Sequence, residues 1–118
     1  MSMLSRYNKS MNTNDDLLII SVIKALSDPI RLKIIHLLKK GRDEECQSPA
    51  SLQNPQALCP KDILRKMEVL SDSKLSYHLK EMKQAGLIVE HREGKRIFYE
   101  LNTEPLGKLS AWLDEFSQ

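Results

Sequence analysis

Hydrophobic residues along this chain recur mostly at helical spacing, with one region of strand-like alternation near the C-terminal end. Residues 15–26 (DDLLIISVIKAL) open with two aspartates, which favour a helix N-terminus, and are then apolar almost all round. That apolar surface is wider than the stripe of an ordinary surface helix. The pattern predicts a first helix that packs on its own core with one face and on a partner subunit with the other. Residues 1–14 are polar, which predicts a flexible segment.

Proline and glycine mark the next elements. Asp28 followed by Pro29 is typical of a helix N-cap and first helical position, and Gly41 is a good C-terminal stop, which together predict a helix over 30–40. Residues 42–59 (RDEECQSPASLQNPQALC) lack periodicity and predict a long loop, with a short helical turn at most around 51–53. A loop of this length is unusual in a compact domain and indicates a functional or mobile segment.

The second half of the chain predicts a helix pair followed by a hairpin. Pro60 introduces a short helix over 61–67, and Ser71 or Asp72 caps a longer helix that runs to about residue 85. The segments 87–91 and 96–101 alternate as two strands, joined through Glu93-Gly94. A last helix over 106–116 has one apolar face that includes Trp112, typical of a core or a dimer interface. The fold class predicted is mainly α with a small β-hairpin (α+β): a winged helix-turn-helix of about five helices and a two-stranded wing.

The length of the chain indicates a single domain, and its charges are unevenly distributed along the sequence. The chain has 118 residues, 41% of them hydrophobic, and a net charge of only +2. Residues 73–99 nevertheless carry six lysines and arginines against three glutamates, and a basic surface suits phosphate binding. No apolar run is long enough to cross a bilayer, and the N-terminal residues lack the apolar core of a secretion signal, so no membrane association and a cytoplasmic location are expected.

The helix over 72–85 and the hairpin tip supply the candidate DNA contacts. Leu75, Leu79 and Met82 share one face of the helix, which predicts their burial. Short hydroxyls, amines and a phenol on the other faces can reach base edges or phosphates, whereas the cations of the tip suit the DNA backbone. The candidates are Ser73, Lys74, Ser76, Tyr77 and Lys80 on the helix, and Arg92, Lys95 and Arg96 at the tip. The alternative is a winged-helix module that binds protein and no operator.

Two segments carry a family resemblance. The runs KALSDPIRLKIIHLLKKG and CPKDILRKMEVLSDSKLSYHLKEMKQAGLIVEHREGKRIFYEL resemble the ArsR/SmtB family of bacterial transcriptional regulators over about residues 15–116, apart from the loop. The resemblance implies a homodimer formed through the first and last helices, which acts as a repressor on an inverted-repeat operator in double-stranded DNA. Family members are released from DNA by an inducer, most often a metal ion. The resemblance also implies that Ser73, Lys74, Ser76 and Tyr77 contact bases or phosphates.

The metal sites of the family do not transfer to this chain. Cys59 occupies the first position of a Cys-x-Cys pair, but the second position is Lys61, a poor ligand for a soft metal. The last helix has no histidine and only Asp114 and Glu115, which are adjacent and point apart, so no metal site and no cofactor are predicted.

The possible sensor residues are Cys46 and Cys59. They are either unreactive thiols, a redox or reactive-species switch, or soft-metal ligands completed by the partner subunit. An enzyme is not expected, because the chain has no glycine-rich phosphate loop and its three histidines are scattered.

Overall fold

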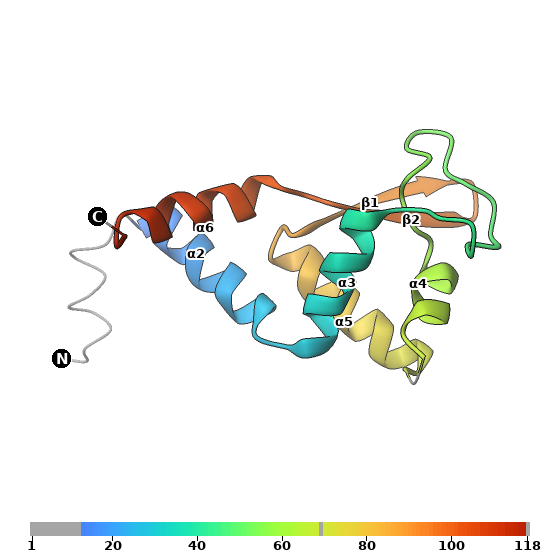
Figure 1. Cartoon of the computed structure of the whole chain (residues 1–118), viewed down its shortest axis with the longest axis horizontal. Coiled ribbons are helices and arrows are strands. Elements are labelled where there is room, and N and C mark those ends of the chain that lie inside the picture. The colour runs from blue at the N-terminus through green and yellow to red at the C-terminus, as the bar shows by residue number, and fades with distance from the viewer. Residues whose placement is uncertain (1–12, 69, 118) are drawn as a thin grey trace.

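The computed structural model describes residues 13–68 and 70–117, and within them it contains five helices and one two-stranded sheet (Figure 1). This architecture confirms the predicted fold class. The first helix begins two residues before the predicted start, and residues 1–12 of the predicted flexible segment lie outside the described residues. The elements are α2 (Thr13–Leu26), α3 (Pro29–Lys40), α4 (Pro60–Lys66), α5 (Asp72–Gln84), β1 (Ile88–Glu93), β2 (Arg96–Leu101) and α6 (Glu104–Asp114).

The capping residues explain where the helices begin. The Asp28 side chain accepts hydrogen bonds from the backbone N–H groups of Ile30 (2.8 Å) and Arg31 (3.3 Å), which fixes the start of α3. Ser71, and not Asp72, is the N-cap of α5, because its Oγ accepts from the N–H of Lys74 at 3.2 Å. Both cap side chains accept hydrogen bonds from backbone N–H groups of the first helical turn, which have no acceptor within the helix.

The hydrophobic core lies where α3, α4, α5 and the hairpin meet, and the second half of α2 contributes Val22 and Ala25 to it. The long loop contributes Leu58 to the same core. Side chains that are completely or almost completely buried include Val22, Ile34, Leu58, Ile63, Leu75, Leu79, Met82, Leu87 and Phe98. The burial of the Leu75, Leu79 and Met82 face confirms the orientation predicted for α5, which leaves its other faces toward solvent.

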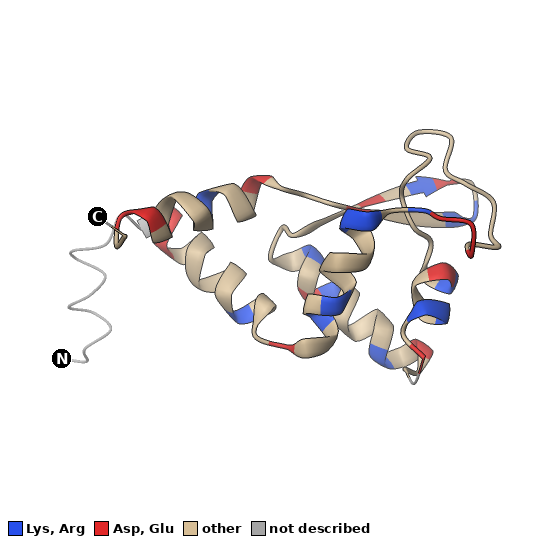
Figure 2. Ribbon diagram, viewed as in Figure 1, with Lys and Arg blue, Asp and Glu red and all other residues tan. Residues whose placement is uncertain are grey.

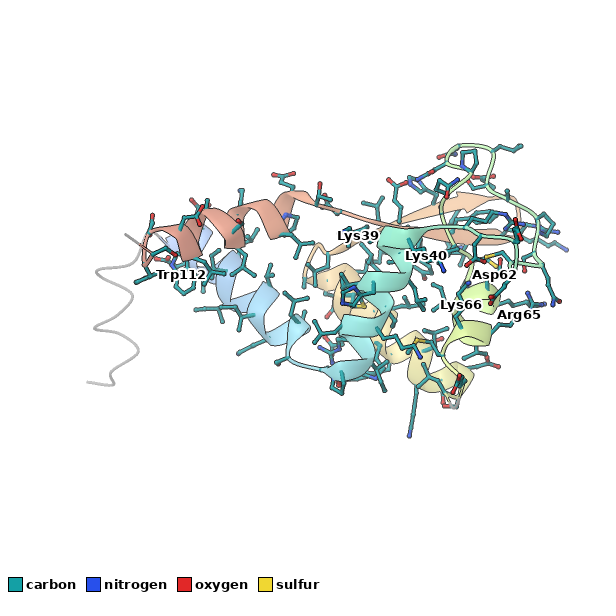
Figure 3. The ribbon with its side chains drawn as sticks, viewed as in Figure 1. Lys39, Lys40, Asp62, Arg65, Lys66 and Trp112 are labelled. Atoms are coloured by element: carbon teal, nitrogen blue, oxygen red, sulfur yellow. The ribbon has the colours of Figure 1, made fainter. Side chains whose placement is uncertain are left out.

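Helices α2 and α6 lie side by side and project from this core as an arm (Figure 1). Trp112 lies on α6 within this arm (Figure 3), and its ring meets that of Phe116 edge-to-face at a centroid distance of 5.0 Å. Nζ of Lys108 on α6 lies 3.8 Å from Oδ1 of Asp15 on α2. The arm leaves large apolar side chains exposed: Leu17, Ile20, Ile23, Leu113 and Phe116. None of the described helices combines the length and the apolar character that crossing a membrane requires.

The hairpin turns at Gly94-Lys95, one residue later than the sequence predicts. Glu93 pairs with Arg96 at the end of the ladder, which leaves these two residues as the connection. Gly94 has φ +64°, the left-handed conformation that a tight two-residue hairpin turn requires at its first position. Strand β1 consequently extends two residues further toward the tip than predicted, to Glu93, whereas β2 spans the predicted residues 96–101.

The segment between α3 and α4, here called the α3–α4 loop (residues 41–59), is fastened to the hairpin. The N–H of Leu58 donates to the carbonyl of Tyr99 at 3.0 Å, and the N–H of Tyr99 donates back to Leu58 at 2.8 Å. Leu58 thereby extends the sheet by one residue on the β2 side. The helical turn predicted at 51–53 is wrong, because residues 52 and 53 form a bend.

Candidate nucleic-acid interface

The five candidate residues of α5 are all exposed. Ser73, Lys74, Ser76, Tyr77 and Lys80 occupy the faces of α5 that point away from the core, and 54% of the Tyr77 surface is open to solvent. Lysines and arginines are concentrated on α3, α4, α5 and the hairpin, whereas the α2–α6 arm carries few (Figure 2). The helix therefore presents hydroxyl, phenol and amine groups at a surface with cationic neighbours.

Arg31 of α3 holds the aromatic side chains of α5 in place. Its Nε donates to Nδ1 of His78 at 3.1 Å, and its guanidinium lies 5.8 Å from the centre of the Tyr77 ring. His78 is buried and meets the Tyr77 ring edge-on at 5.2 Å. His78 is therefore a residue of the core rim, held by Arg31. Sequence reasoning missed Arg31, although it stands directly behind the Asp28-Pro29 cap in the family motif.

The three cations of the hairpin tip are exposed but not equivalent. Nε of Arg92 lies 3.4 Å from Oε2 of Glu90, which is also 3.3 Å from Nζ of Lys83. Among the residues that the structure describes, neither Lys95 nor Arg96 has a carboxylate within ion-pair distance. Lys95 and Arg96 are therefore the two tip cations whose positive charge is not neutralised by a neighbouring carboxylate.

Glu90 is itself held ionised. Burial raises its pKa, but hydrogen bonds from the Tyr99 hydroxyl (3.1 Å) and from Lys83 lower it by more, so that the net pKa lies below its usual value. The pKa of Tyr99 is raised to about 12, mainly because its phenol is buried and next because the phenol donates a hydrogen bond to the Glu90 carboxylate. A charged Glu90 keeps Arg92 against the sheet.

Glu93 fastens the hairpin tip to the α3–α4 loop. Its carboxylate accepts from the Ser51 hydroxyl, from the N–H of Leu52 at 2.8 Å and from the N–H of Gln53 at 3.4 Å. These hydrogen bonds, led by that of Ser51, lower the pKa of Glu93. Ser51 is only 2% exposed although it lies in a loop. We call this contact the Ser51–Glu93 tether.

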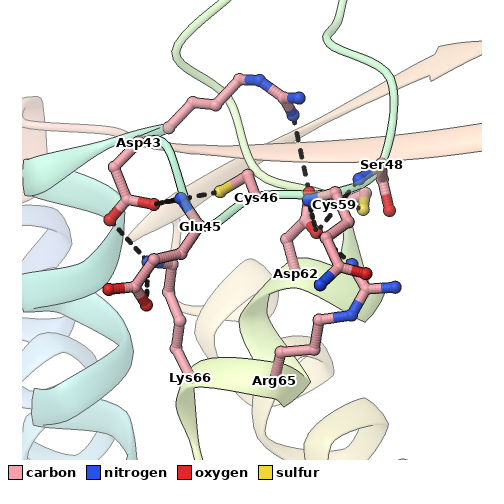
Figure 4. Close-up of polar contacts among 10 residues, drawn as sticks. Asp43, Glu45, Cys46, Ser48, Cys59, Asp62, Arg65 and Lys66 are labelled. Atoms are coloured by element: carbon pink, nitrogen blue, oxygen red, sulfur yellow. Dashed lines mark hydrogen bonds and ion pairs between the residues drawn. The ribbon is translucent and has the colours of Figure 1, made fainter.

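A second set of contacts fastens the other side of the loop to α4 (Figure 4). We call it the Asp62 cluster: it consists of the Asp62 carboxylate, which is 1% exposed, and the groups of Arg42, Gln47, Ser48 and Arg65 that surround it. Oδ1 accepts from the Arg65 guanidinium at 2.7 Å and from the N–H groups of Gln47 (3.2 Å) and Ser48 (3.4 Å). The Arg42 guanidinium lies 3.6 Å from Oδ2. One buried carboxylate thus joins two places in the loop to the first helix of the helix-turn-helix.

Asp43 and Lys66 form the neighbouring ion pair, with 2.6 Å between Nζ and Oδ2. The hydrogen bond from Lys66 lowers the pKa of Asp43 to about 2. The pair adds a third connection between the loop and α4, as Figure 4 shows. The loop that the sequence describes as long and aperiodic is therefore attached to both α4 and the hairpin.

The two cysteines are free, partly buried thiols. Sγ of Cys46 lies 3.7 Å from Oδ1 of Asp43, and Sγ of Cys59 lies 3.4 Å from Oδ2 of Asp62, so each thiol is directed at a different carboxylate (Figure 4). Within the described residues, no group of three or more histidine, cysteine, aspartate or glutamate side chains is placed to hold a metal ion. Asp114 and Glu115 are exposed at the end of α6.

A helix pair with an exposed polar second helix, followed by a basic hairpin, defines a winged helix-turn-helix protein. A family model described as a helix-turn-helix domain matches residues 26–91. The chain is 35% identical over 96 residues to the transcriptional repressor SdpR of Bacillus subtilis, covering 81% of this chain and 89% of the relative. It is 31% identical over 94 residues to an arsenical resistance operon repressor of Staphylococcus xylosus, covering 80% and 75%. The protein belongs to the ArsR/SmtB family of winged helix-turn-helix transcriptional regulators.

Solved structures show the same fold. An ArsR-like transcriptional regulator from Rhodococcus sp. RHA1 superimposes with a TM-score of 0.69 at 21% identity, over 91% of this chain and 84% of the other. The homodimeric winged helix-turn-helix DNA-binding domain of a possible ArsR-family regulator from Mycobacterium bovis, determined by NMR, gives a TM-score of 0.61 at 23% identity, over 91% and 86%.

Proposed function

We propose that the protein is a transcriptional repressor that binds an inverted-repeat operator in double-stranded DNA as a homodimer. The single observation that carries the proposal is the division of α5 into a buried apolar face and an exposed face of Ser73, Lys74, Ser76, Tyr77 and Lys80. The relatives named as repressors support the direction of regulation. The protein acts by binding rather than by catalysis, in the cytoplasm, where its operator lies.

The arm supports the homodimer. Five large apolar side chains, four on α2 and α6 and Phe116 just after α6, are exposed in the single chain, and a partner that covers them removes this surface from water. The Mycobacterium bovis domain of the same fold is a homodimer. To bind an inverted repeat, the two-fold axis of this dimer must set the two copies of α5 in successive major grooves, about 34–36 Å apart.

The residue roles divide between specificity and affinity. We infer that Ser73, Lys74, Ser76, Tyr77 and Lys80 contact base edges and nearby phosphates, and that Arg92, Lys95 and Arg96 contact the backbone. Arg31 supports this arrangement because it restrains the Tyr77 ring from behind. Backbone contacts raise affinity for all sequences, whereas contacts in the major groove distinguish one sequence from another.

Fluorescence anisotropy with DNA from upstream of the gene, against a random duplex of equal length, tests these roles. The Ser76→Glu, Tyr77→Ala double variant should lose the preference for the operator, whereas Lys39→Ala, which changes an exposed lysine of α3, serves as the matched control. The Lys95→Ala, Arg96→Ala variant should weaken binding to both duplexes and reduce the slope of log K against log salt by about 1.8, or 0.9 for each phosphate that is no longer neutralised. Operator preference that survives the double change on α5 refutes the assignment. Absence of binding, or affinity that ignores salt, favours the protein-interaction module.

We further propose that one regulatory input acts through the loop thiols. The observation that favours this is the position of Cys59, whose thiol contacts Asp62 within the Asp62 cluster. Peroxide oxidation of a thiol adds a polar oxygen beside that carboxylate and disturbs the attachment of the loop. Peroxide should weaken operator binding of the parent protein and leave the Cys46→Ser, Cys59→Ser variant unaffected. An equal response of both proteins refutes the thiol switch, and a response to soft metal ions alone favours the metal-responsive alternative.

A further inference from the structure

A cavity of about 520 Å³ lies between the α3–α4 loop, the start of α4 and strand β2. Its volume falls within the range of about 300–1,000 Å³ that small-molecule sites occupy. Pro49 of the loop, Pro60 of α4 and Ile97 of β2 supply apolar wall. The two prolines have fixed backbone φ angles, and the contacts of the Asp62 cluster and the Ser51–Glu93 tether hold the surrounding segments. The cavity is therefore formed before any ligand enters.

Three cations line the same cavity: Lys61 from α4, and Lys95 and Arg96 from the hairpin. All three side chains are exposed, and in the part of the chain that the structure describes none has an ion-pair partner. No carboxylate is among the lining residues. The cavity thus combines apolar wall with uncompensated positive charge, which favours a ligand with an apolar body and a negative group.

We propose that this cavity binds a small organic anion, an aromatic or aliphatic carboxylate, which acts as an effector. The apolar part lies against Pro49, Pro60 and Ile97, while the carboxylate is held by Lys61, Lys95 and Arg96. An apolar ligand without charge would leave the cations unpaired, and inorganic phosphate would leave the apolar wall in water.

The position of the cavity gives the ligand a regulatory consequence, which rests on the proposed function. Lys95 and Arg96 are the hairpin cations assigned to the DNA backbone, and a bound carboxylate neutralises the charge that a phosphate would otherwise meet. The ligand and DNA therefore compete, and each lowers the affinity for the other by the same factor. The ligand acts as an inducer of a repressor.

The test uses 2-naphthoate as the probe and the full-length protein without DNA. Titration is followed by amide ¹H–¹⁵N NMR, with Kd expected near 1 mM, the affinity that a ligand of about thirteen non-hydrogen atoms reaches at ordinary ligand efficiency. Amides of Ser48, Cys59, Lys61 and Ile97 should shift. The neutral analogue 2-naphthamide and sodium phosphate at equal ionic strength should each bind more weakly by about fivefold or more, the factor expected for loss of an exposed charge pair or of the apolar contacts.

Lys61→Gln should weaken naphthoate binding by about threefold to fivefold, whereas Lys39→Gln, outside the cavity, should leave it unchanged. Shifts confined to α2 and α6, equal binding of the amide, or phosphate as effective as naphthoate each overturn the proposal. Operator binding is measured in a separate experiment, so the effector site and the repressor function can be refuted independently. A protein that binds operator but not naphthoate at this cavity refutes only the effector site, and one that binds naphthoate but no operator refutes the repressor.

Discussion

Replacing Asp62 by alanine should destabilise the protein by about 3 kcal/mol. The carboxylate is 1% exposed and accepts from Arg65 at 2.7 Å, from two backbone N–H groups at 3.2 and 3.4 Å, and lies 3.6 Å from Arg42. The charge-assisted bond to Arg65 contributes about 1 kcal/mol once its partly exposed guanidinium is discounted for solvent. The two long N–H bonds contribute about 0.5–1 kcal/mol each, and Arg42 adds less than about 0.5 kcal/mol.

Asp62→Asn separates the charge from the shape of this side chain. Asparagine keeps the volume and one carbonyl oxygen, which can still accept from the two backbone N–H groups, but it loses the attraction to Arg42 and Arg65. The expected loss is about 1–1.5 kcal/mol, half that of alanine. Arg42→Ala, the weakest contact of the cluster, should cost less than about 0.5 kcal/mol.

Urea unfolding followed by circular dichroism measures these differences. The protomer concentration must be equal for all variants, because the apparent stability of the proposed homodimer depends on it. A shift of the midpoint with an unchanged slope reports stability alone. Two results would refute the reasoning: a loss below about 1 kcal/mol for Asp62→Ala, or an Asn variant as unstable as the Ala variant. The first would mean that the buried carboxylate gains no more from its donors than it loses on leaving water.

Three other predictions concern pH and backbone conformation. Because Lys66 lowers the folded-state pKa of Asp43 to about 2, below the ordinary 3.8, the stability that this pair contributes is present above about pH 4 and is lost as the pH falls toward 2; acid unfolding should show Asp43→Asn converging with the parent over that range. Burial and Glu90 raise the pKa of Tyr99 from 10 to about 12, so its contribution is complete below pH 10 and is lost between pH 10 and 12, which the tyrosinate absorbance near 295 nm should report as one late phenol that Tyr99→Phe removes. Gly41→Ala should cost about 1–3 kcal/mol in urea unfolding, because Gly41 has φ +78° and a Cβ there would lie 3.2 Å from a backbone oxygen; an unchanged midpoint would show that the backbone relaxes freely.

The sequence predicts most of the architecture because local signals are strong. The cap formed by Asp28 and Pro29, the stop at Gly41 and the four-and-three spacing of apolar residues in α5 each depend on neighbours within one or two turns. The alternating segments around Gly94 likewise identify the hairpin. The exposed positions of the α5 candidates follow from the same periodicity, because the apolar face determines which residues are left outside.

The attachments of the loop could not be predicted in this way. Ser51 and Glu93 are separated by 42 residues, and Asn54 donates to Glu100 across 46 residues, so neither contact leaves a periodic pattern in the sequence. Asp62 gives a misleading local signal, because a carboxylate in the first turn of a helix is explained by the helix dipole alone. Its burial depends on where the loop lies, which only the folded chain specifies.

The attachment of the loop has a consequence for how the domain can be divided. Residues 60–101 contain α4, α5, the hairpin and every proposed DNA contact, and they resemble a natural minimal fragment. Excision of that fragment would remove the loop donors of Asp62 and Glu93, together with the backbone partner that Leu58 provides to Tyr99. It would also remove α3, and with it Arg31 behind Tyr77 and His78. Residues 60–101 are therefore not an autonomous module that can be transplanted. A chimaera that is meant to keep the geometry of α5 and the hairpin must begin no later than α3.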